Sequence, residues 1–298
     1  MTDDQPEDQR ARLDLATPPG VPGSGRLRYA AAMQLNRCGL LGDEALEVYR
    51  ICAPLDAEDP LALLAARGLD GEAPARSAPA PAPALLLGRL VDAADRYLAG
   101  LCGPGIAEVR ALIGRWRGGP VTARPGAAHP VVAAHLGPAL EALGATHPDL
   151  AAAIKAAAPH LDWVGYDLYP PEEIGPGFAT GHAFASLIGE EAAIAAEDFD
   201  LGLFLIAPDV LYRDHCHPAP ELYAPLTGPH GWRFGTAAPL TVLPAHHPVW
   251  NPPGAVHLTK VGPLPFLCLF AWTRDVSRPA RVVPAADWAE LERFRIGG

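Results

Sequence analysis

The sequence predicts an α+β protein in which a helical N-terminal region precedes a C-terminal antiparallel β-barrel. Apolar residues recur at three-to-four-residue spacing up to about residue 160, which is the period of helices with one buried face. Beyond that point, Pro, Gly and Asp clusters separate short or alternating apolar runs, which is typical of antiparallel strands. We therefore expect a disordered tail over 1–25, a helical region over 26–160 and the barrel over 161–298.

Five amphipathic runs predict the helices. The tail before them contains Asp, Glu, Pro and Gly with little hydrophobic periodicity, so it has no face to bury. A Pro/Ala-rich stretch at 72–83 predicts a semi-extended surface linker, and a second break covers 118–130. The helices either form a separate domain or pack on the outside of the barrel and cover its edges. The five runs are RLRYAAAMQLNRCGLL, DEALEVYRICAPL, ALLLGRLVDAADRYLAGL, GIAEVRALIGRWRGG and PDLAAAIKAAA.

Eight short runs predict the strands of the barrel. Gly and Pro, at 30 and 34 residues, supply the turns that separate these runs. Successive side chains of a strand point to opposite faces, so residues of equal parity within one strand face the same way. The runs are LDWVGYDLY, HAFASLIGE, LGLFLIAP, ELYAPLTG, GWRFG, LTVLPA, AVHLTKV and FLCLFAW.

Composition and charge exclude several classes of protein. With 49% hydrophobic and 19% charged residues, the 298-residue chain is globular rather than disordered. Its formal net charge of −11 excludes a main role in binding nucleic acid and disfavours anionic membrane surfaces. No apolar stretch approaches the roughly 20 residues of a membrane span, and the acidic N-terminus does not resemble a secretory signal. Five dispersed cysteines without a CxxC pair favour a reducing compartment, so we expect a cytoplasmic protein.

A cluster of histidines with one glutamate predicts a metal site. Six of the eleven histidines fall between His215 and His257. Within this segment His215, His217 and Glu221 have the same parity, so a continuous strand points them to one face. Two imidazoles and a carboxylate suit Fe, Mn, Zn, Co or Ni, and we expect one such divalent ion per chain. His257 follows an Asn-Pro-Pro-Gly turn at 251–254, which returns the chain across the barrel, and it is the expected fourth ligand.

These residues resemble the two sequence motifs of the cupin superfamily. The pattern HxHxxxExxxxxxG at 215–228 resembles the first motif, and PxGxxH at 252–257 resembles the second. The chain departs from the usual motifs at three positions that are not predicted ligands, namely Asp209, His246 and Val261. The resemblance implies a cupin-type β-barrel, the double-stranded β-helix, that binds a metal.

The closer resemblance is to bacterial cupin-type dimethylsulfoniopropionate (DMSP) lyases. Their pattern adds two tyrosines to the first motif, and these stand here as Tyr212 and Tyr223 in YxxHxHxxxExY. A tryptophan late in the barrel also matches, because Trp272 lies fifteen residues after His257. The resemblance covers residues 160–275. It implies a metal-dependent carbon–sulfur lyase that splits DMSP by β-elimination into dimethyl sulfide and acrylate.

The resemblance, together with the spacing, suggests roles for the aromatic residues. Tyr223 lies two residues from Glu221 on the same face, so it is the expected general base, or a fifth metal ligand that the substrate displaces. Tyr212 is expected to orient the substrate or to serve as an alternative base. Its parity is opposite to that of His215, so it needs a bulge to face the metal. Trp272 is expected to bind the sulfonium cation through its ring face.

Other activities fit the same ligand set. A cupin dioxygenase with Fe(II) or Ni(II), a cupin sugar isomerase or epimerase, a DMSP lyase-like enzyme with a different substrate, and a non-catalytic binding or sensor module stay open. The two tyrosines favour the lyase, because an oxygenase has no evident need for a phenol base. The expected partner is a small-molecule substrate, without nucleic acid or membrane, and a homodimer is the expected assembly if chains associate.

Overall fold

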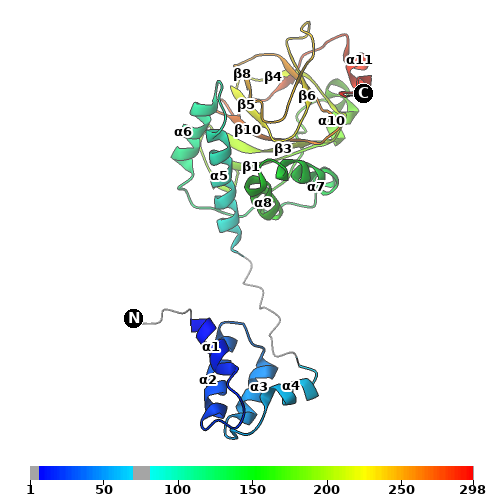
Figure 1. Cartoon of the computed structure of the whole chain (residues 1–298). Coiled ribbons are helices and arrows are strands. Elements are labelled where there is room, and N and C mark those ends of the chain that lie inside the picture. The colour runs from blue at the N-terminus through cyan, green and yellow to red at the C-terminus, as the bar shows by residue number, and fades with distance from the viewer. Residues whose placement is uncertain (1–6, 70–80, 298) are drawn as a thin grey trace. The chain divides into compact units, whose positions relative to one another are not determined.

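The chain forms two compact units, Met1–Pro81 and Ala82–Gly298, and the computed structural model describes residues 7–69 and 81–297 (Figure 1). Helices of the first unit pack around a small core of their own. Arg28 is buried there and donates hydrogen bonds to the carbonyl oxygens of Thr17 and Glu58, each at 3.0 Å, which ties two loops to one helix. The helices are α1 (Glu7–Leu15), α2 (Ser24–Arg37), α3 (Asp43–Cys52) and α4 (Pro60–Ala66).

The segment expected to be a disordered tail is partly helical. Helix α1 lies within residues 1–25, and Ala11 of α1 is 4% exposed in the core of the first unit. One buried alanine and a partly buried Leu15 leave almost no apolar period in the sequence, so this helix has no amphipathic signature. Residues 1–6 lie outside the described residues, as do residues 72–80 of the predicted linker.

The second unit contains two facing β-sheets. The six-stranded sheet has the order β2-β1-β3-β10-β5-β8 and the five-stranded sheet the order β11-β4-β9-β6-β7. Every pair of named strands is antiparallel except β1 with β2. The strands are β1 (His182–Gly189), β2 (Ile194–Ala195), β3 (Asp200–Ile206), β4 (Leu211–Cys216), β5 (Glu221–Pro225), β6 (His230–Phe234), β7 (Thr241–Leu243), β8 (Val249–Asn251), β9 (His257–Lys260), β10 (Phe266–Trp272) and β11 (Arg281–Val282).

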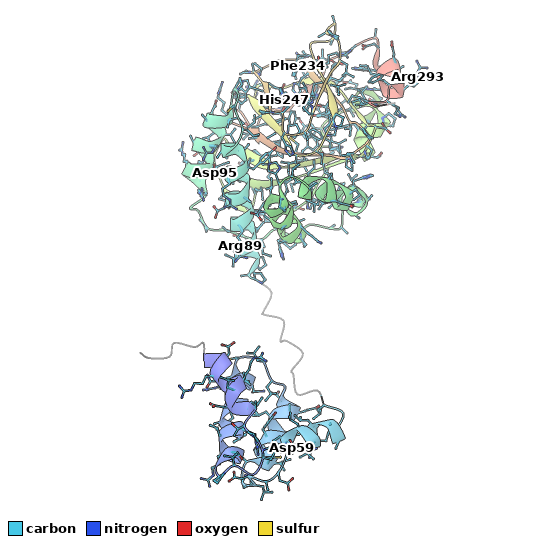
Figure 2. All side chains as sticks on the ribbon, viewed as in Figure 1. Asp59, Arg89, Asp95, Phe234, His247 and Arg293 are labelled. Carbon is cyan, nitrogen blue, oxygen red and sulfur yellow. The ribbon has the colours of Figure 1, made fainter. Side chains whose placement is uncertain are left out.

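Helices pack against the outer face of the six-stranded sheet (Figure 1). Leu203 and Leu205 of β3 join the core that these helices form, whereas Phe204 between them points toward the other sheet and joins an aromatic cluster. On the surface, Asp95 accepts a hydrogen bond from Arg110 at 2.8 Å, which joins two of the helices (Figure 2). The helices are α5 (Pro83–Ala99), α6 (Ile106–Trp116), α7 (Pro130–Gly144) and α8 (Pro148–Ala157), and four short ones follow: η1 (Ala158–His160), α9 (Pro171–Ile174), α10 (Pro176–Thr180) and α11 (Trp288–Arg293).

The predicted fold class is confirmed, because helices precede antiparallel sheets. Of the two arrangements expected for the helices, α5 to α8 follow the second and pack on the outside of the sheets. The strands of residues 182–282 pair as two sheets, so the predicted barrel is a sandwich rather than a closed ring of hydrogen-bonded strands. Within the described residues, no helix has the length and apolar character needed to cross a membrane.

A buried ion pair anchors β4 to β6. The guanidinium of Arg233, whose side chain is 1% exposed, binds both oxygens of the Asp214 carboxylate, whose side chain is fully buried. The Trp288 indole Nε1 donates to the same carboxylate at 2.8 Å. Without Asp214, the buried Arg233 keeps only its ion pair with Asp287, whose side chain is 42% exposed, and Trp288 loses its acceptor. We therefore expect Asp214→Ala to lower the free energy of unfolding by about 3 kcal/mol. Urea unfolding followed by circular dichroism measures this loss.

An exposed ion pair provides the matched control for that experiment. Glu108 lies 3.4 Å from Arg274, and the two side chains are 43% and 51% exposed. Solvent screens such a pair, so Glu108→Gln is expected to change the free energy of unfolding by less than about 0.5 kcal/mol. A cost below about 1 kcal/mol for Asp214→Ala would contradict the anchoring role of the buried pair.

Candidate metal centre

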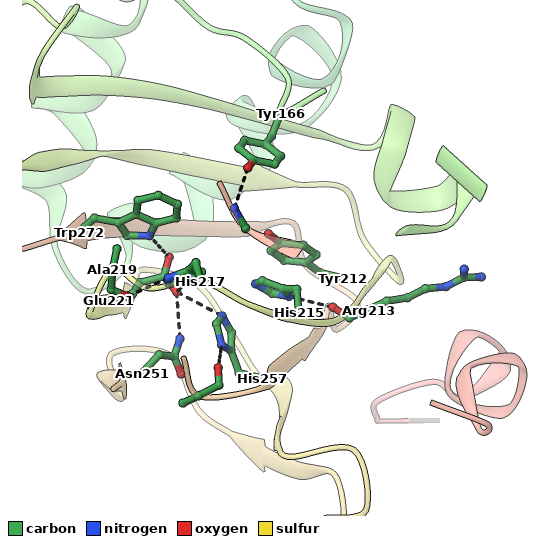
Figure 3. Close-up of polar contacts among 12 residues, drawn as sticks. Tyr166, Tyr212, Arg213, His215, His217, Ala219, Glu221, Asn251, His257 and Trp272 are labelled. Atoms are coloured by element: carbon green, nitrogen blue, oxygen red, sulfur yellow. Dashed lines mark hydrogen bonds and ion pairs between the residues drawn. The ribbon is translucent and has the colours of Figure 1, made fainter. Parts of the chain in front are cut away.

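Four predicted ligands converge between the two sheets (Figure 3). His215 of β4 and His257 of β9 are register partners in the five-stranded sheet, so both imidazoles point to the same face. His217 follows β4 directly. Glu221 begins β5 in the opposite sheet, and its carboxylate Oε2 lies 3.2 Å from His217 Nε2. The structure therefore places all four residues together, with donors from both sheets.

Hydrogen bonds from the three histidines to the backbone determine which ring nitrogen is available to bind a metal. The Nδ1 atoms of His215, His217 and His257 lie 2.8, 2.8 and 2.9 Å from the backbone carbonyl oxygens of Arg213, Ala219 and Ala255. A carbonyl oxygen only accepts, so each Nδ1 carries the proton. Nε2 of His215 and Nε2 of His257 then present lone pairs, whereas His217 Nε2 donates to the Glu221 carboxylate and has to release that proton to bind a metal. This is the arrangement in which a backbone carbonyl orients a metal-ligating imidazole. One nitrogen from each ring lies within 4.8 Å of the other two.

The free nitrogens fit a bound cation. Nε2 of His215 and Nε2 of His257 are buried and have no hydrogen-bond partner among the described residues, which is costly unless something binds them. His257 Nε2 lies 3.3 Å from Glu221 Oε2, outside hydrogen-bond geometry. Three imidazoles and one carboxylate form a donor set that suits a divalent transition metal.

Electrostatics keep two of the donors in their binding forms. Burial, reinforced by the neighbouring His257 and His217, holds the pKa of His215 well below its usual range, so the ring is neutral. Burial alone would raise the pKa of Glu221, but the charge and hydrogen bond of His217 bring it well below its usual range, so the carboxylate is ionised.

A second layer of side chains holds Glu221 and His217. The Glu221 carboxylate accepts hydrogen bonds from Asn251 Nδ2 at 3.0 Å and from Trp272 Nε1 at 2.8 Å (Figure 3). The Trp272 ring also stacks on the His217 imidazole, with ring centroids 4.5 Å apart. Trp272 therefore orients two predicted ligands, besides lining the pocket beside them.

Tyr212 reaches the site through a bulge. Tyr212 pairs with Thr259 and His215 pairs with His257, so two residues of β4, at positions 213 and 214, oppose the single residue 258 of β9. The shift turns the Tyr212 ring inward, where it stacks on His215 with centroids 3.8 Å apart. Its hydroxyl lies 2.9 Å from that of Tyr169, within hydrogen-bond distance.

Tyr223 lies on the inner face of the six-stranded sheet, two residues after Glu221. Its side chain is buried at 3% exposure and lines the same pocket as Glu221. Burial, and then the charge of Glu221, raise the pKa of Tyr223 well above its usual range. In the chain without a cation the phenol therefore keeps its proton.

A pocket opens beside these residues. Its empty volume is about 710 Å³ including the mouth, which is within the usual range for small-molecule sites. Its walls are mainly aromatic and carry the carboxylates of Asp200 and Glu221. Three residues at the site have no signal as functional residues in the sequence. They are Tyr169 and Asp200 in the pocket walls and Asn251 beside Glu221.

The fold is similar to that of solved DMSP lyases. A chain from the crystal structures of the DMSP lyases RdDddP and RnDddQII matches at 22% identity and TM-score 0.54, over 68% of this chain and 100% of that chain. DMSP lyase DddQ from Ruegeria pomeroyi matches at 21% identity and TM-score 0.51, over 67% and 96% of the two chains. A cupin-like protein from Thermotoga maritima matches at 17% identity and TM-score 0.34, over 39% of this chain and 86% of that chain.

The sequence matches a family model as well. The model for dimethylsulfoniopropionate lyase covers residues 116–268, which is more than half of the chain. The matched stretch contains the four predicted ligands and both tyrosines, and it ends before Trp272. No curated protein matches the sequence significantly.

Proposed function

Because the chain belongs to the dimethylsulfoniopropionate lyase family, we propose that it cleaves DMSP, or a close analogue, by β-elimination. One observation carries the proposal. Three imidazoles with oriented Nε2 atoms converge with one carboxylate on the wall of an aromatic pocket. That combination suits a small substrate with one anionic end and one apolar or cationic end.

The reaction breaks two bonds of the substrate. A base removes a proton from the carbon next to the carboxylate. The C–S bond then breaks with its electron pair on sulfur, a C=C bond forms, and dimethyl sulfide and acrylate leave. The proton is weakly acidic, because its loss adds negative charge beside an existing carboxylate. The site therefore has to stabilise that charge, place a base at the carbon and hold the sulfonium end.

The chain provides a donor set for a divalent metal next to the pocket. When bound there, such a metal supplies Lewis-acid stabilisation of the charge that develops on the substrate carboxylate and favours the phenolate form of a neighbouring tyrosine. Nitrogen and oxygen donors of this kind accept Fe, Mn, Zn, Co or Ni. The residues that would hold it are His215, His217, Glu221 and His257.

We assign the base to Tyr223 and the orientation of the substrate to Tyr212. Tyr223 lines the pocket two residues from Glu221, which puts its phenol beside the predicted ligands. The Tyr212 hydroxyl lies within hydrogen-bond distance of the Tyr169 hydroxyl, and the Tyr212 ring stacks on His215. These contacts fix the position of Tyr212, which suits a residue that orients the substrate better than one that removes its proton. Trp272 lines the pocket and offers an aromatic surface to the sulfonium.

Product analysis tests this function. Metal-analysed protein is incubated with DMSP, and headspace gas chromatography measures dimethyl sulfide while liquid chromatography measures acrylate. We expect the two products in equal amounts. Oxygen consumption or sugar isomerisation without dimethyl sulfide would instead support a cupin dioxygenase or isomerase.

A further inference from the structure

One row of side chains crosses the inner face of the six-stranded sheet. Asp200 of β3 is the register partner of Trp272 of β10, and Trp272 is the register partner of Glu221 of β5. Residues paired in this way point to the same face, so all three side chains enter the space between the sheets. Neighbouring strands lie about 4.8 Å apart, which puts the backbones of Asp200 and Glu221 about 10 Å apart with the indole between them.

Asp200 carries a charge that the protein leaves uncompensated. No basic side chain forms an ion pair with it among the described residues. Its Oδ1 is buried beside Gly189 and has no hydrogen-bond partner among the residues that the structure describes. Burial raises the pKa of Asp200 to about 6, against a hydrogen bond from Ser186 that lowers it. The carboxylate is therefore mostly ionised at neutral pH.

Asp200 also lies where two cavities meet. It lines the aromatic pocket and, in addition, a second cavity with an empty volume of about 990 Å³. The second cavity is lined by Asp162, Glu190 and Glu191 against a single cation, Arg124. A cavity with this balance of charge concentrates cations.

We propose that Asp200 recognises the cationic end of the substrate and sets a preference for zwitterions over carboxylates with an uncharged tail. This inference rests on the proposed function and names the group that binds the sulfonium. An ionised carboxylate without a counter-charge gains most from a cation that fills the pocket beside it. The substrate carboxylate then lies at the Glu221 end of the row, and the methyl groups of the sulfonium lie between Trp272 and Asp200.

DMSP and 4-methylpentanoate have nearly the same shape, so comparing their binding separates recognition of the positive charge from recognition of the shape. In 4-methylpentanoate a carbon replaces the sulfonium of DMSP, so the carboxylate and both methyl groups stay and the positive charge is lost. Calorimetry at pH 8 measures the dissociation constants of both ligands in metal-loaded Tyr223→Phe protein, in which cleavage is slow. When Asp200→Asn is added, the dissociation constant of DMSP is expected to rise by about 30-fold or more, and that of 4-methylpentanoate by less than about threefold.

Further variants keep this test decisive. Asp200→Ser is a second neutral variant in case the asparagine disturbs folding. Glu141→Gln removes an equal charge from the exposed surface of α7, outside both cavities, and is expected to change both constants by less than about threefold. Three results would overturn the inference. Two are neutral Asp200 variants that raise both dissociation constants equally or that leave the constant of DMSP unchanged. The third is a protein with Asp200 in place that binds DMSP no more tightly than 4-methylpentanoate. Cleavage is scored separately, because tight, Asp200-dependent binding of DMSP without dimethyl sulfide from the wild type contradicts only the proposed function.

Discussion

Replacing His257 with alanine is expected to remove the metal and to abolish turnover. The His257 imidazole is fully buried, and its Nε2 has no hydrogen-bond partner among the described residues. The ring also lies beside the Glu221 carboxylate, so its loss removes one donor and disturbs another. We expect bound metal to fall to near background and release of dimethyl sulfide to fall by about a thousandfold or more. Plasma mass spectrometry measures the metal, and headspace chromatography measures the product.

His247→Ala is the matched control, because it removes a histidine that is exposed on a loop (Figure 2). It is expected to keep both the metal and the activity. A His257→Ala protein that still binds metal at the wild-type level would exclude His257 from the ligand set.

Tyr223→Phe is expected to lower kcat by about 10²–10⁴-fold while the metal content stays unchanged. The substitution keeps the buried ring in the aromatic cluster and removes only the hydroxyl, so a folding defect is not expected. If Tyr223 removes the proton, the variant also loses exchange of the substrate α-hydrogen with deuterated solvent. Nuclear magnetic resonance of DMSP in D₂O, run beside the product assay, measures that exchange.

Tyr212→Phe distinguishes the two tyrosines. Its ring keeps the stacking contacts with His215 and Phe178, and only the hydrogen bond to Tyr169 is lost. We expect KM to rise more than kcat falls, because the proposed role is to orient the substrate. The opposite pattern, in which Tyr212→Phe stops α-hydrogen exchange and Tyr223→Phe does not, would assign the base to Tyr212.

The placement of the ligands could be predicted from parity and turns. The turn at 251–254 predicts that His257 returns across the barrel to the other ligands, and His257 is the register partner of His215. The turn after His217 moves Glu221 into the other sheet, yet the carboxylate still comes within 3.2 Å of the imidazole. The bulge that Tyr212 required is present as a shift in register between Tyr212 and His215.

The remaining parts of the site depend on pairing between distant strands. Asp200 and Asn251 come to the pocket and to Glu221 only through the register of β3, β10, β5 and β8, which no local pattern encodes. Tyr169 ends the run LDWVGYDLY, for which the sequence predicts a strand, but this run forms only an isolated bridge at Val164 and lies outside the named strands. The contact of Tyr169 with Tyr212 therefore depends on an irregular segment that the alternating pattern does not describe. The expected closed barrel likewise required strand pairs that periodicity does not specify.

Metal titration of the metal-free protein tests most directly whether a metal held by the three histidines and Glu221 activates DMSP. A chelator first removes the metal, and a divalent metal is then added back in steps while bound metal, dimethyl sulfide and acrylate are measured together. We predict that release of both products rises in proportion to bound metal and levels off at about one ion per chain. Saturation with metal and no dimethyl sulfide, or equal release from the metal-free protein, would contradict the proposed chemistry.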